Sequence, residues 1–351
     1  MYHHEYEEQD KKQDDYSHWV GVNGIRVRIR GMNDSTRLFA NGRNVVAVDV
    51  HIIPTDANGK DISIFSSKFL NHVYLIDYET GEHLTRQAKG VSRDNCTWAY
   101  RNSPNSFTEL PDISDYFTKK TITAFDSELT TNMVTFYVYC FRAEEKKIGA
   151  FIKTPNGDEY TSQGTESGQS GFNSHIQLIG IPEIIYSTET IDITDYASHR
   201  RIDSNDDWEY HNTYVSLKNN SLQRERRIIY VDIAGRSNAA YSVFHTGRYN
   251  NIFHYIWEIG CVSDVKLNLD GTDWGIGKFT YDISATIKEM PGALCFTVLY
   301  IKYLNPPYKN INTKLRITLY DQYGNTGDFI VKSKDPTRSK IELQSVNNDE
   351  P

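Results

Sequence analysis

The chain has 351 residues, which is longer than one hydrophobic core usually serves and favours two domains. It contains 24 Tyr, 15 Phe and 5 Trp against only 4 Met, a composition that favours β-sheet proteins over helical ones. Its formal net charge of −8 offers no basic excess to displace counterions from phosphates, so we expect no nucleic-acid partner.

Residues 1–17, MYHHEYEEQDKKQDDYS, hold almost nothing apolar that would offset the entropy of ordering, and they predict a disordered charged tail. This segment is charged where a signal peptide is apolar, and no run of the chain predicts a transmembrane segment. We therefore expect no export by the general secretory route. An extracellular or particle-associated location would then require a non-classical export route. The adjacent His3 and His4 lack the fixed geometry of a metal site.

Residues 43–62 give the clearest strand signal of the chain. Four apolar residues alternate with polar or small ones: Val46, Val48, Val50 and Ile52. This period of two is typical of a half-buried strand. The Asn58-Gly59 pair that follows predicts a two-residue type I′ turn. Residues 60–65 should then begin a return strand or a crossing to a second sheet.

Further strands are predicted in the first half at residues 25–29, 72–77, 133–141, 148–153 and 176–184. A turn is expected at residues 79–81. Residues 88–120, rich in Asn and Ser with two prolines, are predicted to be irregular. Residues 161–174 are rich in Gly, Ser and Gln and predict a mobile loop, in which residues 164–171 should be the first site of limited proteolysis.

The second half repeats several of these patterns. Residues 226–233 match 43–50, residues 293–298 match 133–138, and Tyr323-Gly324-Asn325 predicts a turn like the one at Asn156-Gly157. A duplicated fold explains this similarity, and so does the shared composition of all β-sandwich strands.

Together these patterns predict an all-β protein with two tandem antiparallel β-sandwich domains, immunoglobulin-like or jelly-roll-like. Polar residues accumulate at 186–205, so we place the first domain at residues 18–190 and the second at 191–351.

The stretch NVVAVDVHIIPTDANGKDI, in which alternating valines lead into a D-x-x-G turn, carries a family resemblance. It resembles the early strand and hairpin of bacterial immunoglobulin-like domains of the invasin and intimin kind. The resemblance covers about residues 43–62 and implies an extracellular, non-enzymatic sandwich that serves as a spacer, adhesin or assembly unit. That family has no catalytic motif, so no functional residue is carried over.

Catalytic motifs are absent from the sequence: it has no HExxH, GxSxG, P-loop, GxGxxG or EF-hand pattern. We therefore expect no catalytic residue, no cofactor and no enzymatic activity. Asp270 and Asp273 are weak candidates for binding a hard cation, and a simple Asp-Gly turn explains them better.

The four cysteines are widely spaced and form no CxxC or Cys/His cluster: Cys96, Cys140, Cys261 and Cys295. We expect reduced and mostly buried thiols, with Cys140 on the same strand face as Phe136 and Val138.

Five aromatic residues are candidates for binding a sugar or a protein partner: Trp98, Tyr100, Trp208, Tyr210 and Tyr249. The alternative is that such aromatic side chains pack in the core or at a domain junction. The same alternative applies to Tyr255 and Trp257, which would lie on one face of a strand and pack in the core. Residues 121–135 alternate apolar and hydroxyl side chains, which fits a membrane hairpin of a pore-forming toxin or an amphipathic edge strand.

The leading functional hypothesis is a non-enzymatic binding or assembly protein, acting through a protein partner or self-assembly. Such a protein could be a structural or receptor-binding component of a bacterial or phage-derived extracellular particle or toxin system. The alternatives are a carbohydrate-binding, lectin-like protein and, third, a pore-forming toxin.

Overall fold

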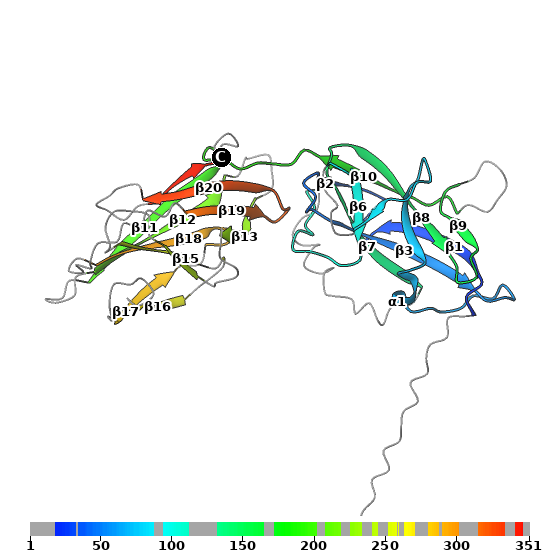
Figure 1. The fold of residues 1–351 in the computed structure, drawn as a ribbon, viewed down its shortest axis with the longest axis horizontal. Helices are drawn as coiled ribbons and strands as arrows, with labels where there is room; N and C mark the ends of the chain where they lie inside the picture. Colours follow the sequence, from blue (N-terminus) through cyan, green and yellow to red (C-terminus); the bar gives the residue numbers. More distant parts are fainter. Residues whose placement is uncertain are drawn as a thin grey trace, which may run out of the picture. The chain divides into compact units, whose positions relative to one another are not determined.

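The computed structural model describes residues 18–32, 34–87, 94–111, 132–164, 172–201, 208–218, 225–233, 241–244, 252–257, 259, 263–270, 280–287, 290–301, 315–333 and 341–346. Within them the chain is all-β, with 21 strands and a single short helix, α1 (Ser66–Phe69). No helix in these ranges is long and apolar enough to cross a membrane. The chain divides into two compact units, Met1–Pro182 and Glu183–Pro351, both of which are β-sandwiches (Figure 1).

The first unit is a sandwich of two sheets. One sheet has the order β1-β3-β7-β6-β5, with β1 (Gly21–Ile29), β3 (Val46–Thr55), β7 (Met133–Cys140), β6 (Trp98–Arg101) and β5 (Thr85–Arg86). The other has the order β2-β10-β8-β4, with β9 beside β8, and comprises β2 (Ser35–Phe39), β10 (Ile176–Ile181), β8 (Glu145–Lys153), β4 (Val73–Asp77) and β9 (Glu159–Thr161). In both sheets of the first unit the strand pairs are antiparallel as expected, except for the parallel pairs β5–β6 in the first sheet and β2–β10 in the second.

The alternation of β3 decides which of its side chains enter the core. Val46, Val48, Val50 and Ile52 are all buried in one cluster that contains residues of both sheets. Each such aliphatic side chain contributes about 1.5–3 kcal/mol when it is removed from water. Cys140 is buried in the same cluster as Phe136 and Val138, so the predicted face of that thiol is confirmed.

The turn after β3 differs from the predicted type I′ turn. Only Gly59 has a positive φ, at 77°, whereas a type I′ turn also needs a positive φ at Asn58. The amide of Gly59 donates to the carbonyl of Asp56 (3.0 Å), and the amide of Asp56 donates to the carbonyl of Lys60 (2.9 Å). The Asp56 carboxylate also accepts from the amides of Asn58 and Lys60, which favours this wider turn, closed by a left-handed glycine.

Residues 60–65 form no continuous strand: one antiparallel bridge joins Asp61 to Thr55, and the alternative expectation of a crossing to the second sheet is confirmed. The chain continues through α1 into β4, which belongs to the opposite sheet. The turn expected at residues 79–81 is confirmed by the positive φ of Gly81 and its bond to the carbonyl of Asp77 (2.9 Å).

The prediction that residues 88–120 are irregular is wrong for part of that range. Residues 98–101 form β6, in which Trp98 and Tyr100 face the core and Ala99 lies on the opposite face of the sheet, buried with Val45 and Tyr139. A strand of four residues is too short to show the alternation of period two that identified the longer strands.

The second unit contains two larger sheets and a hairpin. One sheet has the order β11-β12-β18-β15-β14, with β11 (Ile191–Arg201), β12 (Trp208–Leu217), β18 (Leu294–Ile301), β15 (Ile252–Trp257) and β14 (Tyr241–Phe244). The other has the order β13-β19-β20-β21, with β13 (Ile228–Ile233), β19 (Leu315–Asp321), β20 (Thr326–Ser333) and β21 (Ile341–Ser345). A core cluster joins these sheets, and β16 (Ser263–Asp270) pairs with β17 (Thr280–Ile287) as a separate hairpin.

The polar interval 186–205 contains structured residues of the second unit. The amide of Tyr186 donates to the carbonyl of Thr326 (2.8 Å), and β11 begins at Ile191. The division between the units lies before this interval, after Pro182.

The two units differ in the pairing of two strands that the duplication hypothesis treats as equivalent. In the first unit β3 pairs with β7, whereas the matching strands of the second unit, β13 and β18, lie in different sheets. The expected turn at Gly324 is present, with a φ of 79° and a bond to the carbonyl of Asp321 (3.0 Å). The similarity of residues 226–233 to 43–50 therefore reflects common strand composition rather than an equivalent place in the fold.

Candidate binding cleft

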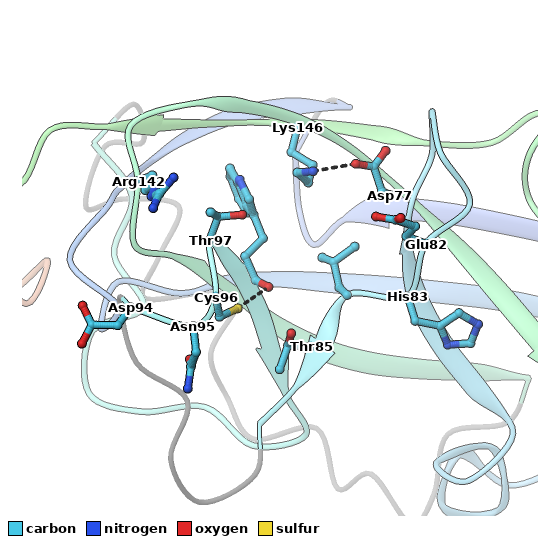
Figure 2. Close-up of a pocket in the computed structure, with 12 residues that line it drawn as sticks. Asp77, Glu82, His83, Thr85, Asp94, Asn95, Cys96, Thr97, Arg142 and Lys146 are labelled. Atoms are coloured by element: carbon cyan, nitrogen blue, oxygen red, sulfur yellow. Dashed lines mark hydrogen bonds and ion pairs between the residues drawn. The ribbon is translucent and has the colours of Figure 1, made fainter.

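An open cleft of about 360 Å³ lies at one end of the first sandwich. It is formed by three separate segments: the end of β4 with the turn into β5, the residues before β6, and the turn between β7 and β8. Its lining residues are Asp77, Glu82, His83, Leu84, Thr85, Asp94, Asn95, Cys96, Thr97, Trp98, Arg142 and Lys146 (Figure 2). Most of these side chains are polar or charged, unlike the mainly apolar lining of small-molecule pockets.

The ion pair between Lys146 and Asp77 forms one wall of the cleft. The two charged groups are 2.5 Å apart, and their side chains are only 22% and 16% exposed. Partial burial alone would raise the pKa of Asp77, but the Lys146 ammonium and the backbone amides of Glu79 and Thr80 outweigh it and hold that pKa below its ordinary value. Asp77 is therefore a fixed anion that positions both the turn and Lys146.

Three other charged groups of the cleft are exposed: Glu82, Asp94 and Arg142. None of the three forms an ion pair within the part of the chain that the structure describes. Figure 2 shows Asp94 and Arg142 at one end of the cleft and Glu82 at the other. These groups are available to complementary charges on a partner.

The Cys96 thiol and the His83 imidazole do not form a nucleophile and base pair. The Sγ atom of Cys96 donates to the carbonyl of Trp98 (2.9 Å). The His83 ring instead contacts the rings of Tyr74 and Phe151, at centroid distances of 5.3 and 4.8 Å. Among the described residues, no three His, Cys, Asp or Glu side chains are placed to share a metal ion.

The predicted aromatic binding residues lie mostly in the interior where the structure describes them. Trp98 and Tyr100 are 3% and 0% exposed, so they belong to the core of the first unit, and burial raises the pKa of Tyr100 to about 12. Tyr210 is 2% exposed, and its hydroxyl accepts a hydrogen bond from the amide of Thr286 in β17 (3.0 Å). The planes of these three rings are thus not presented to solvent.

The remaining candidates lie outside the described part of the structure. This holds for Tyr249 and Asp273, and for the side chains of Trp208 and Asp270. Cys261, residues 1–17, 121–131 and 165–171 likewise lie outside the described residues. The core alternative holds for Tyr255 and Trp257, which are 1% and 3% exposed and stack with a centroid distance of 5.8 Å.

Sequence reasoning missed the charged residues that line the cleft. Asp77, Asp94 and Arg142 come from distant segments and carry no motif spacing. Only the Asp77 turn, which ends in Gly81, had a recognisable signal, and that signal concerned backbone geometry rather than binding.

By fold, then, the chain is a two-unit β-sandwich protein with a polar cleft in its first unit. No family model matches the chain, and no curated protein matches it. One solved structure that it resembles is "Crystal structure of Dpr2 Ig1-Ig2 in complex with DIP-Theta Ig1-Ig3", with a TM-score of 0.22, 9% identity, and coverage of 92% of this chain and 100% of that chain. Another is "Secreted serine protease VesC from Vibrio cholerae", with a TM-score of 0.17, 11% identity, and coverage of 92% of this chain and 51% of that chain.

Proposed function

We propose that the protein is a non-enzymatic binding or assembly component whose first unit recognises a protein partner through the cleft. The observation that carries this proposal is the set of exposed charges of both signs at a polar cleft, Glu82, Asp94 and Arg142, none of which is paired with a described residue. Charges arranged in this way favour specific pairing with complementary charges on another protein.

The partner we propose first is a second copy of the chain. A surface that contacts itself across a two-fold axis must be self-complementary: if one residue of the first copy contacts a second residue of the other copy, the same contact occurs with the two copies exchanged. Asp94 and Arg142 meet this condition, because the Asp94 carboxylate of each copy can pair with the Arg142 guanidinium of the other.

The finer expectations from the sequence belong to this proposal. The first is that the sandwich units are of the bacterial immunoglobulin-like kind. The second is that the protein forms part of an extracellular particle or toxin system. Ordered loops at the end of a rigid sandwich support a recognition role, since scaffolds of this type commonly carry recognition on their loops.

Sedimentation velocity of the full chain over a range of concentrations tests the proposal. We expect concentration-dependent self-association of the wild type, and a loss of about tenfold or more in association for Arg142→Asp. The charge-swapped variant, Asp94→Arg with Arg142→Asp, should recover association, because the pair is restored with reversed charges.

A substitution outside the cleft provides the control. Lys153→Gln removes a cation from an exposed ion pair with Glu159 on the same unit and should leave association unchanged. A wild-type chain that stays monomeric at every concentration would contradict the assembly proposal, as would turnover in a hydrolase screen that one carboxylate substitution abolishes.

A further inference from the structure

The outer face of the first sheet of unit 1 gathers cationic and aromatic side chains. We call it the arginine face, and it consists of Arg26, Arg28 and Arg30 on or next to β1, Asp49 and His51 on β3, Thr135, Tyr137 and Tyr139 on β7, and Arg101 on β6. Strand register places them together. Arg28 lies opposite Asp49, Arg26 opposite His51, and Tyr137 opposite Arg101.

The arginine face has one carboxylate, and that carboxylate is fully engaged. Arg30 contacts both oxygens of Asp49, with Nη2 2.8 Å from Oδ1 and Nε 3.1 Å from Oδ2. The Thr135 hydroxyl also donates to Oδ1 (2.7 Å). With Asp49 only 7% exposed, it neutralises Arg30 and has little capacity left for another cation.

Among the residues that the structure describes, the other arginines of this face have no carboxylate partner. Arg26 and Arg28 are exposed and form no ion pair with any described residue. Arg101 is half-buried, its guanidinium lies 5.2 Å from the centroid of the Tyr139 ring, and its Nε has no hydrogen-bond partner. A partly desolvated cation without a counterion costs free energy, which an anionic ligand would recover.

The spacing of these cations fits an extended ligand better than a single small anion. Alternate residues of one strand lie about 6.7 Å apart, and β1 and β6 are separated by three strand spacings, or roughly 14 Å. Only a chain with repeated anionic groups can contact Arg26, Arg28 and Arg101 together. Tyr137, which is partly exposed between them, offers a ring on which a sugar can stack.

The free edge of β1 disfavours a peptide as this ligand. An added peptide strand needs the outward amides of the edge, but the amide of Val27 already donates to the Oγ atom of Ser174 (2.9 Å). We therefore propose that the arginine face binds an acidic polysaccharide carrying sulfate or carboxylate groups. This inference goes beyond the proposed function, because no residue of the arginine face lines the cleft.

Titration calorimetry of the full chain with a size-defined heparin oligosaccharide tests this inference. We expect binding whose affinity falls steeply with added salt. The variant Arg26→Gln/Arg28→Gln should weaken binding about tenfold or more, and Arg101→Gln should weaken it by about fivefold. The matched control is Lys153→Gln/Arg316→Gln, which removes two cations from exposed ion pairs elsewhere and should bind like the wild type.

Two further ligands separate the sugar from other polyanions. Poly-L-glutamate of equal charge should bind at least about tenfold more weakly than the oligosaccharide, and vesicles of anionic lipid should not compete with it. The inference is overturned if the wild type does not bind the oligosaccharide, if the arginine-face variants bind like the control, or if poly-L-glutamate or the vesicles bind equally well. Association in the ultracentrifuge is measured separately and is expected to be unchanged in these variants, so the two proposals fail independently.

Discussion

At the scale of single residues, the second unit depends on a buried carboxylate. Asp321 is 0% exposed, and its oxygens accept hydrogen bonds from the Tyr186 hydroxyl (2.6 Å), the Asn325 side-chain amide (3.0 Å), and the backbone amides of Tyr323 (2.9 Å) and Asn325 (2.8 Å). Because Tyr186 precedes the first strand of the unit and Asp321 ends β19, this network ties the start of the unit to its core sheet.

Removal of the Tyr186 hydroxyl tests the strength of that network. We expect Tyr186→Phe to lower the free energy of unfolding of the second unit by about 2 kcal/mol, since a buried hydrogen bond to a charged group is lost. Tyr230→Phe is the control, because Tyr230 is 45% exposed, and it should change stability by less than about 0.5 kcal/mol. Urea denaturation measures both, and equal effects would contradict this role for Tyr186.

The lowered pKa of Asp77 predicts a pH dependence for the first unit. A folded-state pKa below the unfolded value means that the stabilisation is complete above the unfolded pKa, near 4, and is lost as the pH falls through the folded-state pKa. Asp77→Asn should therefore be less stable than the wild type at pH 7 by about 1 kcal/mol, and this difference should shrink at acidic pH. Thermal melts from pH 7 to pH 2 measure the difference. Glu159→Gln, in an exposed pair, should melt like the wild type, and a constant Asp77→Asn difference at every pH would refute the argument.

At the scale of elements, alanine substitutions at two glycines with positive φ distinguish the cost of backbone strain from the cost of a steric clash. Gly42 and Gly59 both have positive φ, at 70° and 77°. A Cβ atom at Gly42 would lie 2.2 Å from the Phe141 ring, whereas one at Gly59 would meet nothing within 4 Å. We expect Gly59→Ala to cost about 1 kcal/mol and Gly42→Ala to cost clearly more, measured by urea denaturation. Equal losses would show that the Phe141 ring moves aside freely.

The sequence predicted the long strands well because burial of one face imposes a period of two, as in β3, where Val46, Val48 and Val50 all reach the core. It could not predict β6, since four residues carry too little of that period, or the type of the turn at Asn58, which the Asp56 side chain decides. The cleft could not be predicted for another reason: Asp77 and Arg142 line the same cleft only because β4 pairs with β8, the strand that follows the turn containing Arg142, and no local pattern encodes this pairing.

At the scale of the whole molecule, each unit has its own buried core. The core cluster of the first unit contains residues from Trp19 to Leu178, and that of the second contains residues from Tyr186 to Leu343. We expect residues 18–182 and 183–351, produced as separate chains, each to unfold cooperatively in urea with a strand-rich circular dichroism spectrum. A fragment that stays unfolded would show that its core needs the other unit.

The thiols give a second measurement on the whole chain. Within the described part of the chain, Cys96, Cys140 and Cys295 form no disulfide bond, and burial raises the pKa of Cys140 to about 12. We expect thiol titration to recover four thiols in denaturant, and Cys140 to react slowly in the native protein because its thiolate is disfavoured. Recovery of two or fewer would reveal disulfide bonds and an oxidising history.

The place of β10 in its sheet has a consequence for how the protein is made. β10 is the last strand of the first unit along the chain, yet it lies between β2 and β8 and pairs with both. During synthesis on the ribosome, β2 therefore has no neighbour in its sheet until Ile176–Ile181 has emerged from the exit tunnel. For most of its translation the nascent first unit therefore has an incomplete second sheet with unpaired strand edges. Chaperones that shield exposed strand edges would act in this interval.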